Sequence, residues 1–271
     1  MSPGDGAPPL GQHFLHDPAV IERIVDALQP DGRTVVEIGP GRGALTHLLA
    51  ERAEHLVAVE LDRDLAKALQ QDPGLRGVRI EQGDVLARPL SEWAPERAED
   101  ESFLLAGNLP YQITSPILFA CFDAGPDLER AVLMMQREVA ERLVAGPGSR
   151  TYGILSVFGS VYTRPELLFR VGSGAFQPPP GVESAVVRLE VRPAPLFDIR
   201  RGSEEEDWFR RVVKAAFGQR RKMLRNSLEG GLPVERAEVQ EAGEEAGIDL
   251  RRRAETLGPG EFALLARALS R

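Results

Sequence analysis

The tetrapeptide Asn108-Leu109-Pro110-Tyr111 combines residue types with the most specific chemistry in this chain. It follows an apolar run, residues 103–106, so we expect it where a buried strand ends and a loop begins. A carboxamide, a rigid proline and an aromatic face stand together in it. Carbonyl-type oxygens can accept the hydrogens of an amino group while an aromatic ring stacks on a flat base. The motif therefore predicts a binding site for an amino-bearing ring such as adenine.

A glycine-rich segment, residues 39–43, follows the β-branched run 34–38. Glycine lets the backbone approach a ligand closely, and the N-terminus of the following helix offers free N–H groups. Glu60 lies about 20 residues beyond the loop, a spacing at which an acid accepts both hydroxyls of a ribose. Together they predict a site for an adenosine-containing cofactor. Enzymes that use NAD have the same combination of a glycine loop and an acid. The structural alternatives are a tight turn for the loop and a helix-start acid beside Asp62 for Glu60.

Asp84 follows a further expected strand end, after Gly83. A carboxylate there can accept a hydrogen bond from an adenine amino group, although aspartate is also common in turns.

Alternating strands and helices are expected to position these residues. The β-rich runs are residues 34–38, 56–59, 78–81, 103–106 and 131–135, with helical spacing between them. This alternation predicts an α/β fold, a Rossmann-like doubly wound and mostly parallel sheet with helices on both faces. The β-rich runs 166–171 and 185–191 can extend it. Only helical periodicity follows residue 204, so we expect a disordered leader at 1–10, an α/β domain at 11–195 and a small all-helical domain at 200–271.

The overall composition narrows the class of protein. The chain has 271 residues, and 42% of them are hydrophobic, yet no run approaches the roughly 20 apolar residues of a membrane span. Residues 1–9 lack the features of a signal peptide, so we expect a cytoplasmic protein. Cys121 is the only cysteine, which excludes an intrachain disulfide and a multi-cysteine metal site. The four histidines show no metal-ligand spacing, so no metal is expected.

The formal net charge of -8 argues against a nucleic-acid-binding protein, but the charge is unevenly distributed. Residues 214–225 contain five basic side chains and no acid, and Arg251, Arg252 and Arg253 form a second basic cluster. Because salt confines such effects to about 8–10 Å, a local basic patch can still bind phosphate. The alternative is an ordinary solvated surface.

The order of the motifs at the strand ends resembles that of class I S-adenosylmethionine-dependent methyltransferases that act on adenine N6. Five further segments narrow the resemblance to the small-subunit (16S) ribosomal RNA adenine N6,N6-dimethyltransferase family, over residue 11 to the C-terminus. These segments are residues 11–15 (GQHFL), 136–139 (QREV), 176–180 (FQPPP), 184–187 (SAVV) and 217–222 (FGQRRK).

The resemblance implies an enzyme that dimethylates N6 of two adjacent adenosines near the 3' end of small-subunit (16S) ribosomal RNA, during maturation of the subunit. It implies S-adenosyl-L-methionine as cofactor, an S-adenosylmethionine-binding catalytic domain at 11–195 and an RNA- or ribosome-binding domain at 200–271. The implied partner is small-subunit RNA within a pre-assembled subunit. We expect a monomer with no membrane and no metal partner.

The resemblance also implies site residues. The implied cofactor contacts are His13, Leu15, Gly39, Gly41, Glu60, Asp84 and Asn108. The Asn108 side-chain oxygen and the Pro110 carbonyl would bind the N6 hydrogens, Tyr111 would stack on the base, and Phe176 would form a second aromatic wall unless it only packs in the core. The implied RNA contacts are Arg220, Arg221, Lys222 and Arg225. The residues alone indicate only a capping role for His13 and a core position for Leu15.

Three other functions stay open. A nicotinamide-dependent oxidoreductase would use the glycine loop and Glu60 but would leave the tetrapeptide unexplained. The related large-subunit RNA enzymes share the catalytic motifs, although residues 217–222 favour the small-subunit group. A ribosome-assembly factor could depend on binding more than on chemistry. The sequence also departs from the family pattern, because residues 7–10 lack the Lys or Arg that often precedes the Gly-Gln pair.

Overall fold

The computed structural model describes residues 13–95, 97, 101–219 and 221–270. The expected leader at 1–10 and the predicted RNA contact Arg220 therefore lie outside the described residues. The chain divides into two compact units. The α/β unit comprises the described residues up to Ala140 together with Glu166–Val191, and the helical unit comprises Glu141–Pro165 and the residues from Arg192 onward.

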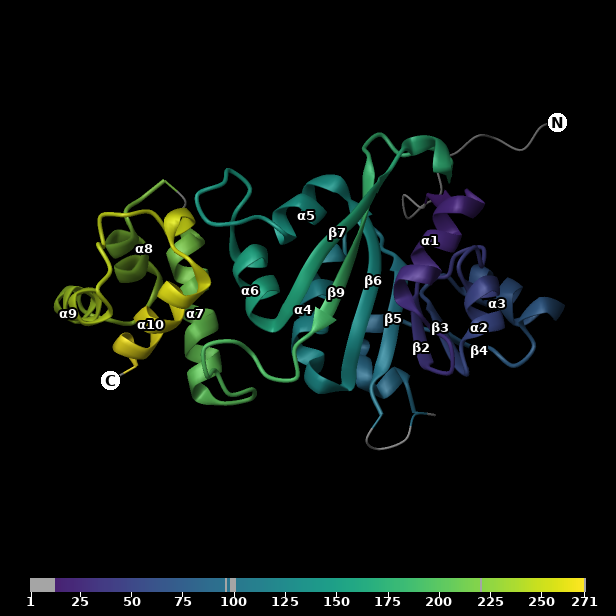
Figure 1. Cartoon of the computed structure of the whole chain (residues 1–271), viewed down its shortest axis with the longest axis horizontal. Coiled ribbons are helices and arrows are strands. Elements are labelled where there is room, and N and C mark those ends of the chain that lie inside the picture. The colour runs from purple at the N-terminus through teal and green to yellow at the C-terminus, as the bar shows by residue number, and fades with distance from the viewer. Residues whose placement is uncertain (1–12, 96, 98–100, 220, 271) are drawn as a thin grey trace. The chain divides into compact units, whose positions relative to one another are not determined.

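A seven-stranded sheet forms the centre of the α/β unit, in the order β4-β3-β2-β5-β6-β9-β7 (Figure 1). The pairs from β4 to β6 are parallel, and β9 is antiparallel to β6. The strands are β2 (Thr34–Ile38), β3 (His55–Glu60), β4 (Arg79–Gln82), β5 (Phe103–Asn108), β6 (Leu128–Gln136), β7 (Thr163–Val171) and β9 (Ser184–Val191). This order confirms the predicted Rossmann-like class. It also brings the carboxyl ends of β2, β3 and β5 to one edge of the sheet.

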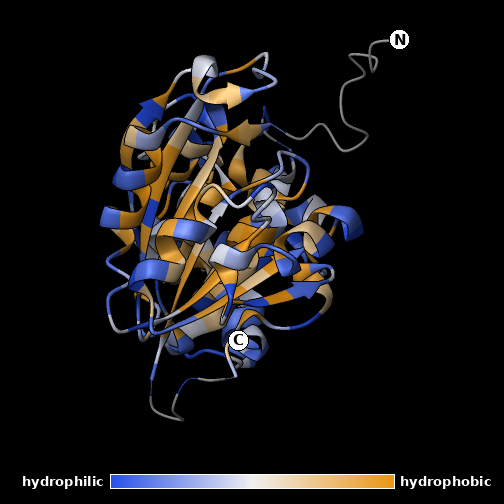
Figure 2. Cartoon of the chain, turned by 90° about the vertical axis from the view of Figure 1, so that its right-hand side faces the viewer, coloured by the Kyte–Doolittle hydropathy of each residue, from blue (hydrophilic) through white to orange (hydrophobic). Residues whose placement is uncertain are grey.

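Helices cover the sheet on both faces, because the central strands are apolar on both faces. They are α1 (Pro18–Leu28), α2 (Thr46–Arg52), α3 (Arg63–Gln70) and α4 (Thr114–Ala124), whereas α5 (Arg137–Leu143) follows β6 and spans the boundary between the two units. Asp17 caps α1 by accepting from the N–H groups of Ala19 and Val20, and Pro18 supplies the first helical residue. Figure 2 shows hydrophobic residues along the strands and hydrophilic residues on the outward turns of the helices.

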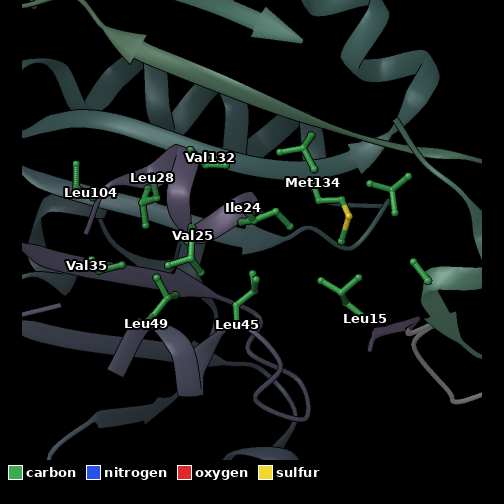
Figure 3. Close-up of a cluster of buried hydrophobic side chains, with 14 of the residues drawn as sticks. Leu15, Ile24, Val25, Leu28, Val35, Leu45, Leu49, Leu104, Val132 and Met134 are labelled. Carbon is green, nitrogen blue, oxygen red and sulfur yellow. The ribbon is translucent and has the colours of Figure 1, made fainter. Parts of the chain in front are cut away.

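One hydrophobic cluster joins α1 and α2 to alternate residues of the strands. Ile24, Val25 and Leu28 of α1 pack with Leu49 of α2 and with strand residues such as Leu104, Val132 and Met134 (Figure 3). Because side chains alternate along a strand, the intervening residues of β5 and β6 point to the opposite face of the sheet, where α4 packs against β6.

Two short strands lie outside the main sheet. β1 (Phe14–Leu15) pairs antiparallel with β8 (Phe176–Gln177), with Leu15 opposite Phe176 and Phe14 opposite Gln177. Leu15 is buried in the same cluster as α1 and the central strands. We call residues 13–15 the N-terminal strap.

The helical unit contains α6 (Ile154–Tyr162), α7 (Glu204–Gly218), α8 (Leu224–Gly231), α9 (Arg236–Ala246) and α10 (Pro259–Leu269). Its core is rich in aromatic contacts, as between Phe158 and Phe209, whose ring centroids lie 6.0 Å apart. Residues 141–165, which the sequence prediction kept within the α/β domain, belong to this unit by their contacts. The reason is that α6 is apolar on most sides and packs against α7 and α10. Among the described residues, no helix is long and apolar enough to cross a membrane.

Candidate active site

A cavity opens at the carboxyl ends of β2, β3 and β5. The space inside it, its open mouth included, is about 780 Å³. Six of the seven predicted cofactor contacts line it, namely His13, Leu15, Gly39, Gly41, Glu60 and Asn108. It is lined as well by the other residues predicted to contact the base, Pro110, Tyr111 and Phe176. The strand ends and the strap therefore meet at one place.

Asp84 is the predicted cofactor contact that does not line the cavity. It is exposed, and its Oδ1 accepts the N–H of Leu86 at 2.9 Å, which caps the 3₁₀ turn Val85–Ala87. The Gly83 N–H donates to the Glu60 carbonyl at 2.9 Å, so the backbone just before Asp84 is fixed beside the end of β3. Its predicted contact with an adenine amino group stays a prediction.

The Glu60 carboxylate holds the glycine-rich loop in place. It is only 4% exposed, and its two oxygens accept the N–H groups of Gly41 and Asp62, both at 2.9 Å. The second contact is the helix-start role that the sequence left open as an alternative. Each carboxylate oxygen has a further lone pair, so these bonds leave Glu60 able to accept ribose hydroxyls.

Gly41 has a backbone conformation and a neighbour that both exclude a side chain. Its φ of +59° lies in the left-handed region, and a Cβ there would lie 3.1 Å from Cδ1 of Phe14 in the strap. The guanidinium of Arg42 lies over the Phe14 ring, 4.2 Å from its centroid. The loop and the strap are therefore packed directly on each other.

Glu37 is a cavity residue that the sequence prediction did not single out. It is 1% exposed, and burial raises its pKa to about 8, although the nearby Thr46 hydroxyl favours the charged form. Within the described chain, Oε2 of Glu37 is buried and has no hydrogen-bond partner. A buried carboxyl oxygen that lines a cavity without a protein partner indicates a cationic ligand group. The available signal was an acid inside the apolar run that leads into the glycine turn.

Asn108 is anchored by the strap. Its Nδ2 donates to the backbone carbonyl of His13 at 3.0 Å, which leaves Oδ1 as the acceptor at the other side of the carboxamide. The ring of Tyr111 lies 6.0 Å from that of His13, measured between centroids. The Tyr111 hydroxyl is 3.4 Å from Oγ of Ser184.

The structure differs from the prediction for Pro110. Its carbonyl oxygen already accepts two hydrogen bonds, from the N–H of Ile113 at 3.2 Å and from Oγ1 of Thr114 at 3.1 Å. Both lone pairs are thus used in starting α4 when no base is bound, and the predicted contact of this oxygen with N6 stays a prediction. Leu109 lines the cavity too, its side chain is buried, and its N–H donates to the Met134 carbonyl at 2.9 Å. The Leu109 carbonyl is therefore the better candidate for the second acceptor.

Phe176 is 2% exposed and pairs with Leu15 across the two short strands. It lines the cavity, but the contacts it makes are those of core packing, the alternative considered for it. Its predicted role as an aromatic wall stays a prediction.

Both basic clusters of the sequence lie in the helical unit. Arg221 and Lys222 are exposed, and Arg225 is half-buried. The three arginines of the second cluster each pair with an acid of their own unit: Arg251 with Asp249 at 3.0 Å, Arg252 with Glu261 at 3.2 Å, and Arg253 with Glu255 at 3.9 Å. The first cluster therefore carries the stronger case for phosphate contacts.

Comparisons with known proteins agree with this geometry. Residues 6–270 match the family model described as "Ribosomal RNA adenine dimethylase". The chain is 46% identical over 262 residues to "Ribosomal RNA small subunit methyltransferase A" of Desulfitobacterium hafniense, covering 96% of this chain and 91% of that protein. It is 45% identical over 266 residues to the protein of the same name from Geobacter sulfurreducens, covering 96% and 94%.

Two solved structures are similar over nearly the whole chain. The 23S rRNA methyltransferase ErmE aligns with a TM-score of 0.68 and 28% identity, covering 95% of this chain and 100% of that one. A dimethyladenosine transferase from Plasmodium falciparum aligns with a TM-score of 0.74 and 22% identity, covering 93% and 96%, which supports the fold.

Proposed function

Because the chain belongs to the ribosomal RNA adenine dimethylase family, we propose that its strand-end cavity dimethylates adenine N6 of small-subunit ribosomal RNA with S-adenosylmethionine as methyl donor. The observation that carries this proposal is the Asn108 carboxamide, which the His13 carbonyl holds by its Nδ2 at a cavity lined by a glycine loop and two buried acids. Relatives named for the small subunit at 45–46% identity favour that RNA over the large-subunit RNA that ErmE acts on.

The chemistry of the cavity fits the proposed cofactor. Glu60 can accept ribose hydroxyls, Gly39 and Gly41 let the backbone approach closely, and the buried carboxyl of Glu37 matches a ligand ammonium group. When bound, S-adenosylmethionine supplies an electrophilic methyl group on a sulfonium. A nicotinamide cofactor would share the ribose contact but would leave the Asn108 carboxamide without a role.

The residues of the chain then act by positioning and by electrostatics. The lone pair of adenine N6 is delocalised into the ring, so N6 is a poor nucleophile. Oδ1 of Asn108 and the carbonyl of Leu109 accept the two N6 hydrogens, which favours a more tetrahedral nitrogen and orients its lone pair. Tyr111 stacks on the base, which must leave its own stack to enter the cavity. No strong base is needed, because the methylated nitrogen is a cationic acid that loses its proton readily.

The second methyl transfer places a different demand on the two acceptors. After the first transfer N6 carries one hydrogen, so only one of the two oxygens can receive a hydrogen bond from it. The loss of either acceptor should therefore affect the first and the second methyl addition unequally.

RNA is bound, in this proposal, through phosphate contacts of Arg221, Lys222 and Arg225. The net charge of -8 favours a pre-assembled small ribosomal subunit over naked RNA as the substrate, because protein contacts can then add to a local basic patch.

The test is mass spectrometry of small-subunit RNA after incubation with the protein and labelled S-adenosylmethionine. The expected product is N6,N6-dimethyladenosine, and the Asn108→Ala variant should keep most of its affinity for the cofactor while methylating more slowly by orders of magnitude. Gln112→Ala is the matched control, since it removes an exposed carboxamide four residues further along the chain. Methylation of large-subunit RNA alone, or near-normal methylation by Asn108→Ala, would contradict the proposal.

A further inference from the structure

The two ends of the Asn108 carboxamide are alike in shape and opposite in hydrogen bonding. A rotation by 180° exchanges Oδ1 and Nδ2 with little change in packing, so hydrogen bonds decide which way the group lies. The partner at one end is the His13 carbonyl, 3.0 Å from Nδ2, and a carbonyl can only accept. The rotated group would place an oxygen against that carbonyl and an NH2 group against the amine of the target base.

We propose that the backbone carbonyl of His13 is a positioning group for methyl transfer, which fixes the Asn108 carboxamide in the orientation that presents Oδ1 to the target N6. This inference rests on the proposed function for the chemistry of Oδ1. It assigns to the N-terminal strap a role in the transfer step that is separate from cofactor contact.

Contacts away from Asn108 determine where this carbonyl lies. Nδ1 of His13 donates to the Pro178 carbonyl at 2.8 Å, and the His16 N–H donates to the Ala175 carbonyl at 3.0 Å. Phe14 packs on Gly41, and Leu15 is only 6% exposed. The strap is therefore held on both sides of the carbonyl, as a positioning group requires.

The carbonyl can be weakened without changing any side chain. Replacing Phe14 by its α-hydroxy analogue, through a suppressor tRNA in cell-free synthesis, turns the His13–Phe14 peptide bond into an ester, whose carbonyl is a poorer acceptor. The matched control replaces Leu15 by its α-hydroxy analogue, which weakens the Phe14 carbonyl instead. Both changes remove one strap N–H, so a general loosening of the strap affects both proteins.

The first readout needs no substrate. The chain contains two asparagines, Asn108 and Asn226, so labelling asparagine with ¹⁵N gives two side-chain amide signals in an NMR spectrum. The Asn108 signal, identified by its loss in Asn108→Ala, should shift and its protons should exchange faster in the Phe14 ester and not in the Leu15 ester. Asn226 serves as the internal reference. An Asn108 signal that does not respond to the Phe14 ester would overturn the proposed hydrogen bond.

The second readout separates transfer from binding. In the Phe14 ester we expect the single-turnover methylation rate to fall on the order of tenfold, the effect of weakening one well-placed hydrogen bond. The dissociation constant of S-adenosylmethionine should change by less than about twofold, as expected when ground-state binding is unaffected. Equal rate losses in the two esters, or weaker cofactor binding with an unchanged rate, would refute the positioning role. A wild-type protein that methylates no ribosomal RNA would instead refute the proposed function, and the NMR result would still stand.

Discussion

The buried carboxyl of Glu37 should make the stability of this protein fall as the pH rises. The pKa of this group is raised from 4.5 to about 8, chiefly by burial and further by the nearby Glu60 carboxylate. The folded protein therefore holds a proton on Glu37 at neutral pH, and the unfolded chain does not. The resulting contribution to stability is fully present below about pH 4.5 and is lost as the pH rises through about 8.

The size of the effect follows from the shift. At about 1.4 kcal/mol per pKa unit, the whole shift corresponds to roughly 5 kcal/mol, of which about 2 kcal/mol is lost between pH 6.5 and pH 9. Glu37→Gln keeps the size of the side chain and cannot ionise. The difference in unfolding free energy between the wild-type protein and Glu37→Gln should therefore move by about 2 kcal/mol, against the wild type, over that interval.

Urea denaturation at several pH values measures this difference, with the m-value checked for constancy. Saturating S-adenosylmethionine should reduce the pH dependence of the wild-type protein, because a ligand cation beside Glu37 lowers its pKa. Parallel pH profiles for the two proteins would refute the reasoning, and so would a wild-type profile that gains stability relative to Glu37→Gln above pH 7.

Two further predictions concern the glycine loop and the basic patch. Gly41→Ala should weaken S-adenosylmethionine binding at least about tenfold, because its Cβ would lie 3.1 Å from the Phe14 ring. Gly32→Ala is its control, with a similar φ of +65° and no atom within 4 Å of the added Cβ, and equal losses of affinity in calorimetry would count against the steric argument. Arg221→Glu should weaken small-subunit binding and flatten its dependence on salt, whereas Arg251→Glu, at a residue already paired with Asp249, should have a smaller effect. A salt series with the same slope for wild type and Arg221→Glu would contradict the phosphate contact.

The sequence predicted the strand ends well because their signals are local. Gly39, Glu60 and Asn108 each follow an apolar or β-branched run, and parallel strands bring their carboxyl ends to one edge of the sheet. The fold class and the family could be predicted for the same reason, because short apolar runs, short motifs and their order along the chain indicate both. Both predictions were confirmed.

Contacts between distant parts of the chain were not predictable in this way. Nothing near Leu15 indicates that it pairs with Phe176, and nothing near Ile154–Tyr162 indicates that this helix belongs with the C-terminal helices. The orientation of a carbonyl depends on its hydrogen bonds, so the engagement of Pro110 by Ile113 and Thr114 was visible only in the structure.

The pairing of the strap with β8 has a consequence for the synthesis of the protein. His13 and Pro178 are separated by 165 positions, and their hydrogen bond joins the strap to the segment that follows β8. At about 5–20 residues per second, translation takes roughly 8–33 seconds to pass from the first residue to the second. In the later part of that interval, once β5 has been made, the nascent chain can pair β2, β3 and β5, but the strap still lacks its partner β8. The cavity is thus completed only after most of the chain has been made, and a partly translated chain presents the glycine loop with one wall missing.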